Sequence, residues 1–340
     1  MKKLLIFLLA TLALSACEKP VVDENPSIPM PPNNEIWYTS SDNDVVIPND
    51  ANVFGANIVN NSYIDGKGVI TFDGDVTLIG DEAFWFCTTL TSITIPDSVT
   101  SVYSRAFAYC TSLGEFKGKF AEDNGRILVV TDDDGNGFLA GFAPRGVTVY
   151  SIPDCVTTIG GYAFYCCENL TSVTIPDSVT EIGKSAFDRC SSLTSVTIPD
   201  SVTTIGDFAF EYCSSLTSIT IPDSVTTIGR SAFRDCTSLT SVTIPDSVYI
   251  ILPYAFYRCE NLTSVTIGSS VMVMYDGTFK DCESLINVYC KAITPPQLGD
   301  KVFDGNASGR VIYVPAESVD AYKSAEYWSG YASAIVGYNF

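Results

Sequence analysis

The sequence contains no histidine and few basic residues. Without histidine the chain cannot assemble Ser–His–Asp or Cys–His catalytic sites, or the common histidine-containing zinc sites. Lysine and arginine number 19 against 39 aspartates and glutamates, which gives a formal net charge of −20. So acidic a chain is repelled by polyanions, and we therefore expect no nucleic-acid partner.

Long apolar runs are also missing, except near the start of the chain. Two lysines precede an apolar stretch from Leu4 to Leu14, which is too short to span a bilayer but has the plan of an export signal. The Leu-Ser-Ala-Cys tetrad that ends at Cys17 resembles the bacterial lipobox. We therefore predict a lipoprotein signal peptide over residues 1–16 and lipid attachment at Cys17. The alternative is a plain secretory signal that is cut near Ala16.

An acylated cysteine would be the sole membrane anchor, because no later segment has the length and apolarity of a membrane helix. Residues 17–35 are rich in proline and asparagine and nearly free of aromatics, which is the composition of a flexible linker. We expect an exported bacterial lipoprotein at the outer membrane and cell surface, whose linker holds the folded part away from the bilayer.

From Asp177 to Leu262 the sequence repeats every 23 residues, almost letter for letter. In this stretch SVTIPDSVTTIGDFAFEYCSSLT is followed directly by SITIPDSVTTIGRSAFRDCTSLT. Self-similarity at such a period is typical of a solenoid, in which each coil buries its apolar side only by stacking on its neighbours.

Each coil is expected to open with a strand. In one copy Val196 and Ile198 face inward, while the serine and threonine that alternate with them face outward. A Pro-Asp-Ser turn ends this strand. Ala209, Phe210 and Cys213 then follow an i, i+1, i+4 pattern, which predicts one or two turns of helix on the outer side of the coil.

The A-F-x-x-C-x-x-L-x-x-V-x-I-P core of the copies resembles the BspA-type leucine-rich repeat of bacterial surface proteins. The resemblance covers roughly Asp73 to Cys290, and the A-F-x-x-C element recurs eight times, with Thr278 in place of alanine in the last copy. It implies an α/β repeat solenoid, that is, a leucine-rich-repeat-like right-handed superhelix with a parallel inner β-sheet and short outer helical turns. Stacking would align the phenylalanines and the cysteines of this element into two columns.

The solenoid is expected at residues 79–290, with a cap at each end. Residues 36–78 carry short β-like pieces that would form an N-terminal β cap, and residues 291–340 would form a C-terminal cap with a strand and a short helix. The period breaks at about 116–150, where two β-like segments flank the sequence DDDGNG. This insertion predicts a β-hairpin that projects from the solenoid.

The tip of this hairpin matches the first half of a calcium-binding loop. Asp132, Asp134, Asn136 and Gly137 have the spacing with which an EF-hand loop begins, but its twelfth position is Ala143 instead of glutamate. The flanking segments also favour strands over helices. We therefore expect no metal and no cofactor and interpret these residues as a solvated turn, with a calcium loop as the alternative.

Twelve cysteines in an exported chain would ordinarily indicate a disulfide framework. Eight of them are repeat positions, which we interpret as buried and mostly reduced packing groups. Acylation of Cys17 would leave an odd number, so complete pairing within the chain is impossible. Cys155, Cys166 and Cys290 lie outside the column and are the better candidates for bonding.

Two surfaces could bind a partner, and the first is the outward face of the strands. It is a flat ladder of small hydroxyl groups that could meet an extended ligand, although such residues are also ordinary solvated β-formers. We expect this uniform face to offer no pocket. The candidate residues are Ser172, Thr174, Ser195, Thr197, Ser218, Thr220, Ser241 and Thr243.

The second surface surrounds the A-F-x-x-C element, where the copies differ most. Aromatic residues and arginines, which protein interfaces favour, are concentrated there. The alternative is that they hold one coil to the next. The candidate anchors are Tyr162, Tyr165, Phe208, Tyr212, Tyr254, Tyr257, Arg234 and Arg258.

These features predict a non-catalytic cell-surface lipoprotein that binds a macromolecular partner, with an extracellular or surface protein as the first choice. The family resemblance implies adhesion or interaction with host or neighbouring cells. Glycan capture for nutrient uptake is the alternative, although none of the three tryptophans lies on an expected strand face. A glycosidase that uses two carboxylates is a third and weaker hypothesis, because near-identical coils offer no unique cleft.

Overall fold

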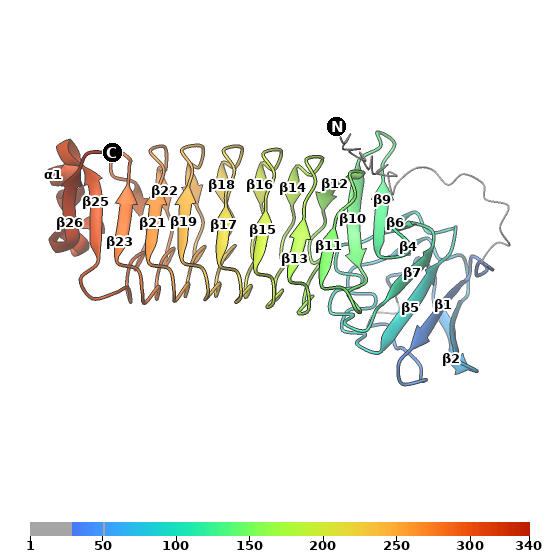
Figure 1. Ribbon diagram of the computed structural model, residues 1–340. Helices are drawn as coiled ribbons and strands as arrows, with labels where there is room; N and C mark the ends of the chain where they lie inside the picture. Colours follow the sequence, from blue (N-terminus) through green and yellow to red (C-terminus); the bar gives the residue numbers. More distant parts are fainter. Residues whose placement is uncertain (1–28, 50–51) are drawn as a thin grey trace, which may run out of the picture.

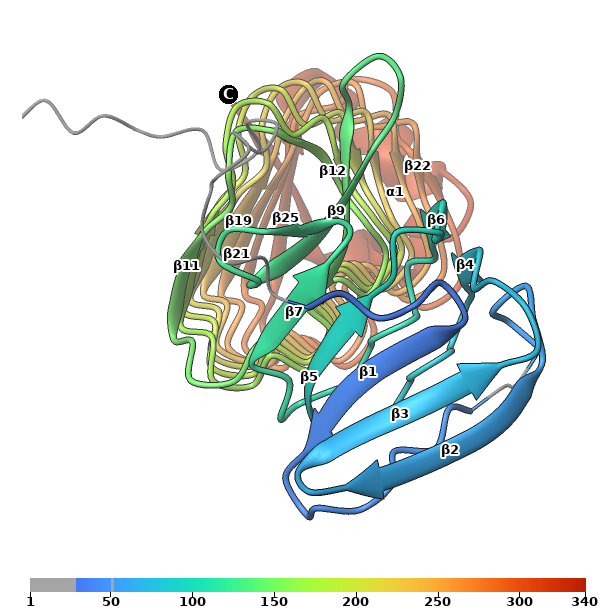
Figure 2. The ribbon, with the colours of Figure 1, turned by 90° about the vertical axis from the view of Figure 1, so that its right-hand side faces the viewer.

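The computed structural model describes residues 29–49 and 52–340, which form an elongated stack of coils (Figure 1). The predicted signal peptide, Cys17 and the first part of the predicted linker lie outside the described residues. Parallel strands of successive coils pair along the stack, as expected for a solenoid. After a 90° turn the coils lie one behind another (Figure 2).

The first ladder consists of the strands expected from the serine–threonine alternation. Val173, Val196 and Ile219 lie in register and are buried, so the neighbouring hydroxyl residues point away from the core. This confirms the parallel inner sheet. The strands are β11 (Val149–Ser151), β13 (Ser172–Thr174), β15 (Ser195–Thr197), β17 (Ser218–Thr220), β19 (Ser241–Ile244), β21 (Ser264–Ile267), β23 (Asn287–Cys290) and β25 (Val311–Pro315).

A second parallel ladder lies where each coil returns to the core after the Pro-Asp-Ser turn. Most of its strands have two residues, of which the second, such as Ile205 or Ile228, is buried. These buried residues stack in register on the inner side. The strands are β12 (Val156–Ile159), β14 (Glu181–Ile182), β16 (Thr204–Ile205), β18 (Thr227–Ile228), β20 (Ile250–Ile251), β22 (Val273–Met274) and β24 (Gln297–Leu298).

The predicted outer helical turns are wrong, because this part of each coil consists of consecutive turns. In one coil Phe208 and Tyr212 adopt φ angles of 60° and 57°, which lie outside the α-helical region. The N–H groups of Phe208, Phe210 and Tyr212 donate to carbonyls of the next coil at 2.8 to 2.9 Å, and the N–H groups between them donate three residues back. Every second N–H is thus used between coils, so the i to i−4 bonds of a helix cannot form. The handedness of the superhelix stays a prediction.

A column of stacked phenylalanines fills the core. Phe187, Phe210 and Phe233 are fully buried, and their nearly parallel rings have centroids 5.2 and 5.4 Å apart. Burial of each ring contributes about 1.5–3 kcal/mol, and it requires a neighbouring coil on both sides. The column of the main stack comprises Phe164, Phe187, Phe210, Phe233, Phe256, Phe279 and Phe303, and Phe84 and Phe107 form a separate stacked pair in the N-terminal core.

The repeat cysteines form a second buried column. Cys213 Sγ donates to the Phe187 carbonyl at 3.2 Å, and the same bond recurs along the stack. The eight repeat cysteines are free thiols. Cys166 and Cys290, two of the candidates for bonding, are also free thiols, and Cys290 Sγ lies 3.3 Å from Tyr322 Oη. Cys155, the third candidate, is disulfide-bonded, as predicted.

An antiparallel arrangement closes the N-terminal end of the stack. β1 (Glu35–Ser40) pairs antiparallel with β3 (Lys67–Phe72) on one side and with β5 (Leu90–Ile95) of the first coil on the other. β2 (Ile58–Ile64) pairs with β3, and β7 (Glu115–Gly118) pairs parallel with β5. The short strands β4 (Leu78–Ile79) and β6 (Ser101–Val102) pair parallel. The edge of the first coil strand is therefore covered by β1.

The insertion contains the predicted β-hairpin, and the strands of this hairpin join the stack. β9 (Ile127–Thr131) and β10 (Gly137–Phe142) pair antiparallel, β8 (Ala121–Glu122) pairs with β9, and β10 pairs parallel with β12. Alternate side chains of the hairpin face two different apolar cores: Leu128 packs in the N-terminal core and Leu139 in the core of the main stack. The hairpin therefore joins the two cores, and its tip is exposed.

The C-terminal end is closed by β26 (Ile335–Tyr338), which pairs with β25, and by η1 (Ala316–Ser318), α1 (Val319–Ser324) and η2 (Trp328–Ala334). Tyr322 and Trp328 are buried and donate to the carbonyls of Ala292 and Pro296, both at 2.7 Å. These bonds attach the helical turns to the last coil. Within residues 29–49 and 52–340, no helix has the length and apolarity that crossing a bilayer requires.

Candidate ligand-binding surfaces

The strand face, defined as the outward surface of the first ladder, carries the predicted hydroxyl ladder. Its eight predicted residues are exposed, apart from the half-buried Ser172. Their hydroxyl groups form no hydrogen bond within the described part of the chain. By contrast, the threonine that precedes a strand uses its hydroxyl group within the protein: Thr217 Oγ1 donates a hydrogen bond to the Thr194 carbonyl at 3.2 Å. The strand face thus holds donors and acceptors that a ligand or water can use.

The strand face is interrupted between β17 and β19, which belong to different sheets. A cavity of about 550 Å³ lies there, so the expectation of a face without a pocket was wrong. This volume is within the range of sites that take small ligands or side chains. The hydroxyl and charged residues that line it are Ser218, Thr220, Ser241, Thr243, Asp223, Asp246 and Lys291.

Three tyrosines, which we call the tyrosine shelf, end the strand face: Tyr289, Tyr313 and Tyr338. Tyr289 lies in register with Thr266 and Tyr313, so it occupies the outward position that threonine holds in earlier coils. The rings of Tyr289 and Tyr313 stack at 4.7 Å and 10°, and Tyr338 stands edge-on to both. The shelf was not among the sites predicted from the sequence. Aligning N-V-Y-C of the last coil with S-V-T-I of the others is the signal that could have found it.

The turn face, defined as the outer side of the consecutive turns, carries the predicted anchors. Arg234 lies over the rings of Tyr212 and Tyr257 at 5.8 and 5.3 Å. The same guanidinium is 3.4 Å from Glu211, and Arg258 is 3.4 Å from Asp235 of the preceding coil. Cations and rings thus contact one another between coils, which supports the alternative that these residues hold the stack together.

The other predicted anchors contact residues of their own coil or of an adjacent coil. Tyr254 and Tyr257 pack edge to face at 5.7 Å, and Lys280 lies 5.1 Å from the Tyr257 ring. Tyr162 packs against Tyr165 at 5.6 Å, and Lys184 lies 5.7 Å from the Phe208 ring. These side chains are less available to a partner than the hydroxyls of the strand face.

Three acidic residues, Asp188, Glu211 and Asp235, are buried beneath the turn face. Asp188 and Glu211 are only 7% and 8% exposed. Burial, and next the charge of Glu211, raises the pKa of Asp188 to about 7, and its Oδ1 has no hydrogen-bond partner among the described residues. A raised pKa suits a general acid, but burial keeps a substrate away from this pair. The pair therefore lends no support to the glycosidase hypothesis.

The hairpin tip uses its acidic oxygens within the turn. Asp132 accepts hydrogen bonds from the N–H groups of Asp134 and Asn136 at 3.0 and 2.8 Å, and from Asn136 Nδ2 at 2.9 Å. The bonds from Asn136 lower the pKa of Asp132. Over the described ranges, no group of three or more cysteines or acidic residues is arranged to hold a metal ion.

Known proteins similar to this chain are bacterial leucine-rich-repeat proteins. The family described as the BspA type leucine rich repeat region matches six copies over residues 33–121, 142–251 and 203–325. A leucine-rich-repeat protein from T. pallidum is 29% identical with a TM-score of 0.52, over 59% of this chain and 94% of that one. One from Eubacterium ventriosum is 25% identical with a TM-score of 0.58, over 69% of this chain and 63% of that one, which is less than two thirds of its length. No curated protein matches the chain.

Proposed function

Since the chain belongs to the BspA-type leucine-rich-repeat family, we propose that it is a non-catalytic lipoprotein, anchored through Cys17, that binds an extracellular or surface protein. Repeat scaffolds of this family are typical of bacterial surface proteins and are typically non-catalytic. Their function lies in the residues that each member displays. For this chain we assign adhesion to host or neighbouring cells, at the outer surface of the outer membrane.

The observation that carries the proposal is the contrast between the two surfaces. On the strand face, exposed hydroxyls that form no hydrogen bond to any described residue flank a cavity between β17 and β19. On the turn face, Arg234 and the aromatic anchors are already engaged with one another. An extended protein segment could follow the strand face, place one side chain in the cavity and exchange hydrogen bonds with the hydroxyls on either side.

Thr220→Arg tests this assignment, because a large charged side chain would fill the cavity. The matched control is Thr226→Arg, an exposed threonine outside the strand face. Surface plasmon resonance against a panel of purified extracellular-matrix proteins measures the affinity. We expect Thr220→Arg to weaken binding at least about tenfold, which corresponds to about 1.4 kcal/mol, and Thr226→Arg to leave it unchanged. Equal losses in both variants, or no binding to any member of the panel, would contradict the proposal.

Anchoring through Cys17 is tested separately. Mass spectrometry of the protein purified from membranes should find an acylated cysteine as the first residue. Cys17→Ala should release the protein from the membrane fraction, because the variant lacks the cysteine to which the lipid anchor would be attached. Digestion of whole cells with added protease distinguishes the outer surface from the periplasm. Intact protein after such digestion would exclude the cell surface.

Glycan capture is a second candidate, and the tyrosine shelf is the observation that favours it. Two stacked and half-exposed rings beside a row of hydroxyls suit a sugar, whose C–H face can pack on the negative face of an aromatic ring. Tyr313→Ala should abolish binding on a glycan array, whereas Tyr249→Ala, an exposed tyrosine outside the shelf, should not. An array without any bound glycan would leave protein binding as the function.

A further inference from the structure

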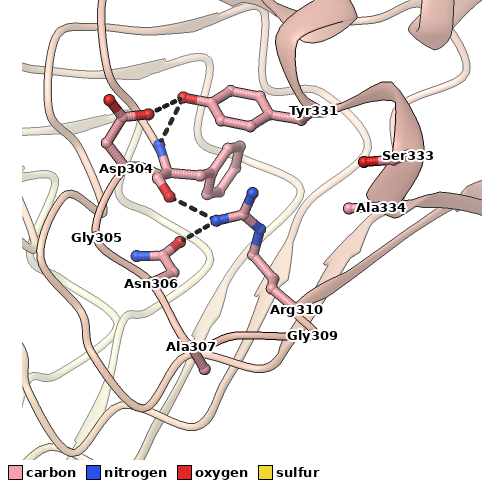
Figure 3. A pocket seen from close by; sticks show the side chains of 10 residues that line it. Asp304, Gly305, Asn306, Ala307, Gly309, Arg310, Tyr331, Ser333 and Ala334 are labelled. Carbon is pink, nitrogen blue, oxygen red and sulfur yellow. Dashed lines mark hydrogen bonds between the residues drawn. The ribbon is translucent and has the colours of Figure 1, made fainter.

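The C-terminal cap contains a cavity of about 520 Å³, which lies between the loop after Phe303 and η2 (Figure 3). The guanidinium of Arg310 is held in its wall against two rings, with centroids at 5.5 Å for Phe303 and 5.0 Å for Tyr331, and these rings contact each other edge to face. Nη1 of Arg310 donates to the Phe303 carbonyl at 2.5 Å and to Asn306 Oδ1 at 3.0 Å. These contacts fix the plane and direction of the guanidinium.

The rest of this guanidinium lacks a partner in the part of the chain that the structure describes. Nε is buried without an acceptor, and Nη2 forms no hydrogen bond there. No ion pair of Arg310 occurs in that part either, although Arg105, Arg234 and Arg258 all have one and acidic residues outnumber basic ones by 39 to 19. An unpaired and half-buried cation is costly, and burial accordingly lowers the pKa of Arg310.

The acidic residue in the cavity wall is engaged with another group. Asp304 Oδ1 accepts a hydrogen bond from Tyr331 Oη at 2.9 Å. Tyr331 Oη in turn accepts a hydrogen bond from the Phe303 N–H at 3.3 Å (Figure 3). The Tyr331 ring is thereby locked against the guanidinium. Ser333 and Ala334 of η2 line the cavity as well, and Ser333 is exposed.

We propose that this cavity binds a small ligand through its carboxylate, with the unbonded Nη2 N–H groups of Arg310 as the recognition element. A carboxylate accepts charge-assisted hydrogen bonds from such N–H groups, and the two rings hold the guanidinium in place before the ligand arrives. The volume lies within the range of about 300–1,000 Å³ that small-ligand sites occupy. A peptide C-terminus and an acidic sugar both carry the required group. The site is separate from the strand face.

The test follows the side-chain Nε–Hε signal of Arg310 by ¹⁵N NMR of the purified protein, with the signal assigned by its absence in Arg310→Lys. N-acetylglycine represents a peptide C-terminus, glucuronate represents an acidic sugar, and N-acetylglycinamide is the matched neutral probe. We expect a saturable shift with one or both carboxylates and none with the amide. Saturation by N-acetylglycine alone identifies the ligand as a peptide terminus, and saturation by glucuronate alone identifies it as an acidic sugar.

A second pair of variants leaves the bonds of Arg310 in place. Ser333→Phe should obstruct the cavity and weaken the saturable binding at least tenfold. Ser329→Phe, at an exposed serine that does not line the cavity, should leave it unchanged. The proposal is overturned if neither carboxylate gives a saturable shift, if the amide shifts the signal equally, or if Ser333→Phe binds like the unaltered protein.

Discussion

Asp188 lies one coil before Glu211, and the two carboxyl groups are buried at the same position of successive coils beneath the turn face. The charge of Glu211 makes Asp188 harder to ionise, because burial in a medium of low polarity strengthens the repulsion between like charges. Their proximity makes the stability of the central coils depend on pH.

Asp188→Asn should remove much of this dependence. The folded state keeps a proton on Asp188 up to a pKa of about 7, whereas the unfolded chain releases it near the ordinary value of 3.8. The free energy of unfolding therefore falls as the pH rises from about 4 to about 7, by up to about 4 kcal/mol for this group. In urea titrations Asp188→Asn should match the unaltered protein at pH 4 and exceed it in stability at pH 8. The control is Asp200→Asn at an exposed turn, and a gain as large at that position would refute the assignment.

Phe210→Ala should destabilise the stack by about 3–5 kcal/mol, because it leaves a cavity between the rings of Phe187 and Phe233. Phe86→Ala is the control: its ring is 59% exposed and stacks on Tyr109, so we expect a loss of about 1 kcal/mol or less. Chemical unfolding followed by circular dichroism measures both. A similar decrease in the free energy of unfolding in both variants would show that the phenylalanine column does not stabilise the core more than an exposed ring does.

Two leucine-to-alanine substitutions in the hairpin should each destabilise a different part of the protein. Leu128→Ala and Leu139→Ala should each cost about 2–5 kcal/mol, since both side chains are fully buried. Hydrogen exchange should accelerate around β1 to β7 in Leu128→Ala and around β12 and β14 in Leu139→Ala, because the two leucines face different cores. Asp133→Ala at the exposed tip should leave exchange unchanged. If hydrogen exchange accelerates in the same region in both leucine variants, the two side chains do not pack in different cores.

The column thiols should be inert in the folded protein. Burial raises the pKa of Cys87 to about 11 and that of Cys213 well above its usual value, and reactive cysteines need the thiolate. A chromogenic disulfide reagent at pH 8 should therefore modify none of the buried cysteines until a denaturant is added. Mass spectrometry of the alkylated protein locates any exception. Rapid modification of Cys213 without denaturant would contradict the burial described above.

Most of the coil could be predicted from the sequence because the repeat reports the same environment many times. The alternation around Val196 gave the strand and its outward hydroxyls, and the spacing of Phe210 and Cys213 gave their burial. The same spacing suggested a helix, however, since apolar periodicity does not reveal a positive φ at Tyr212. Only the hydrogen bonds between coils make that conformation favourable.

The parts that escaped prediction depend on contacts between unlike segments. The cavity between β17 and β19 is lined by the same serine and threonine positions that other coils carry, so these residue types do not mark it. Leu128 and Leu139 read as an ordinary hairpin, and their division between two cores depends on what lies on each side. Arg310 lies beyond the periodic region, where no repeat defines its surroundings.

The alternation of N–H groups along the turns also limits how such a protein can change in length. A single inserted or deleted residue would shift donors out of phase with the acceptors of both adjacent coils, whereas gain or loss of 23 residues preserves every pairing. Recombination between neighbouring copies in the gene therefore yields longer or shorter arrays that still fold. The length of the stack can therefore vary in whole coils without alteration of either end.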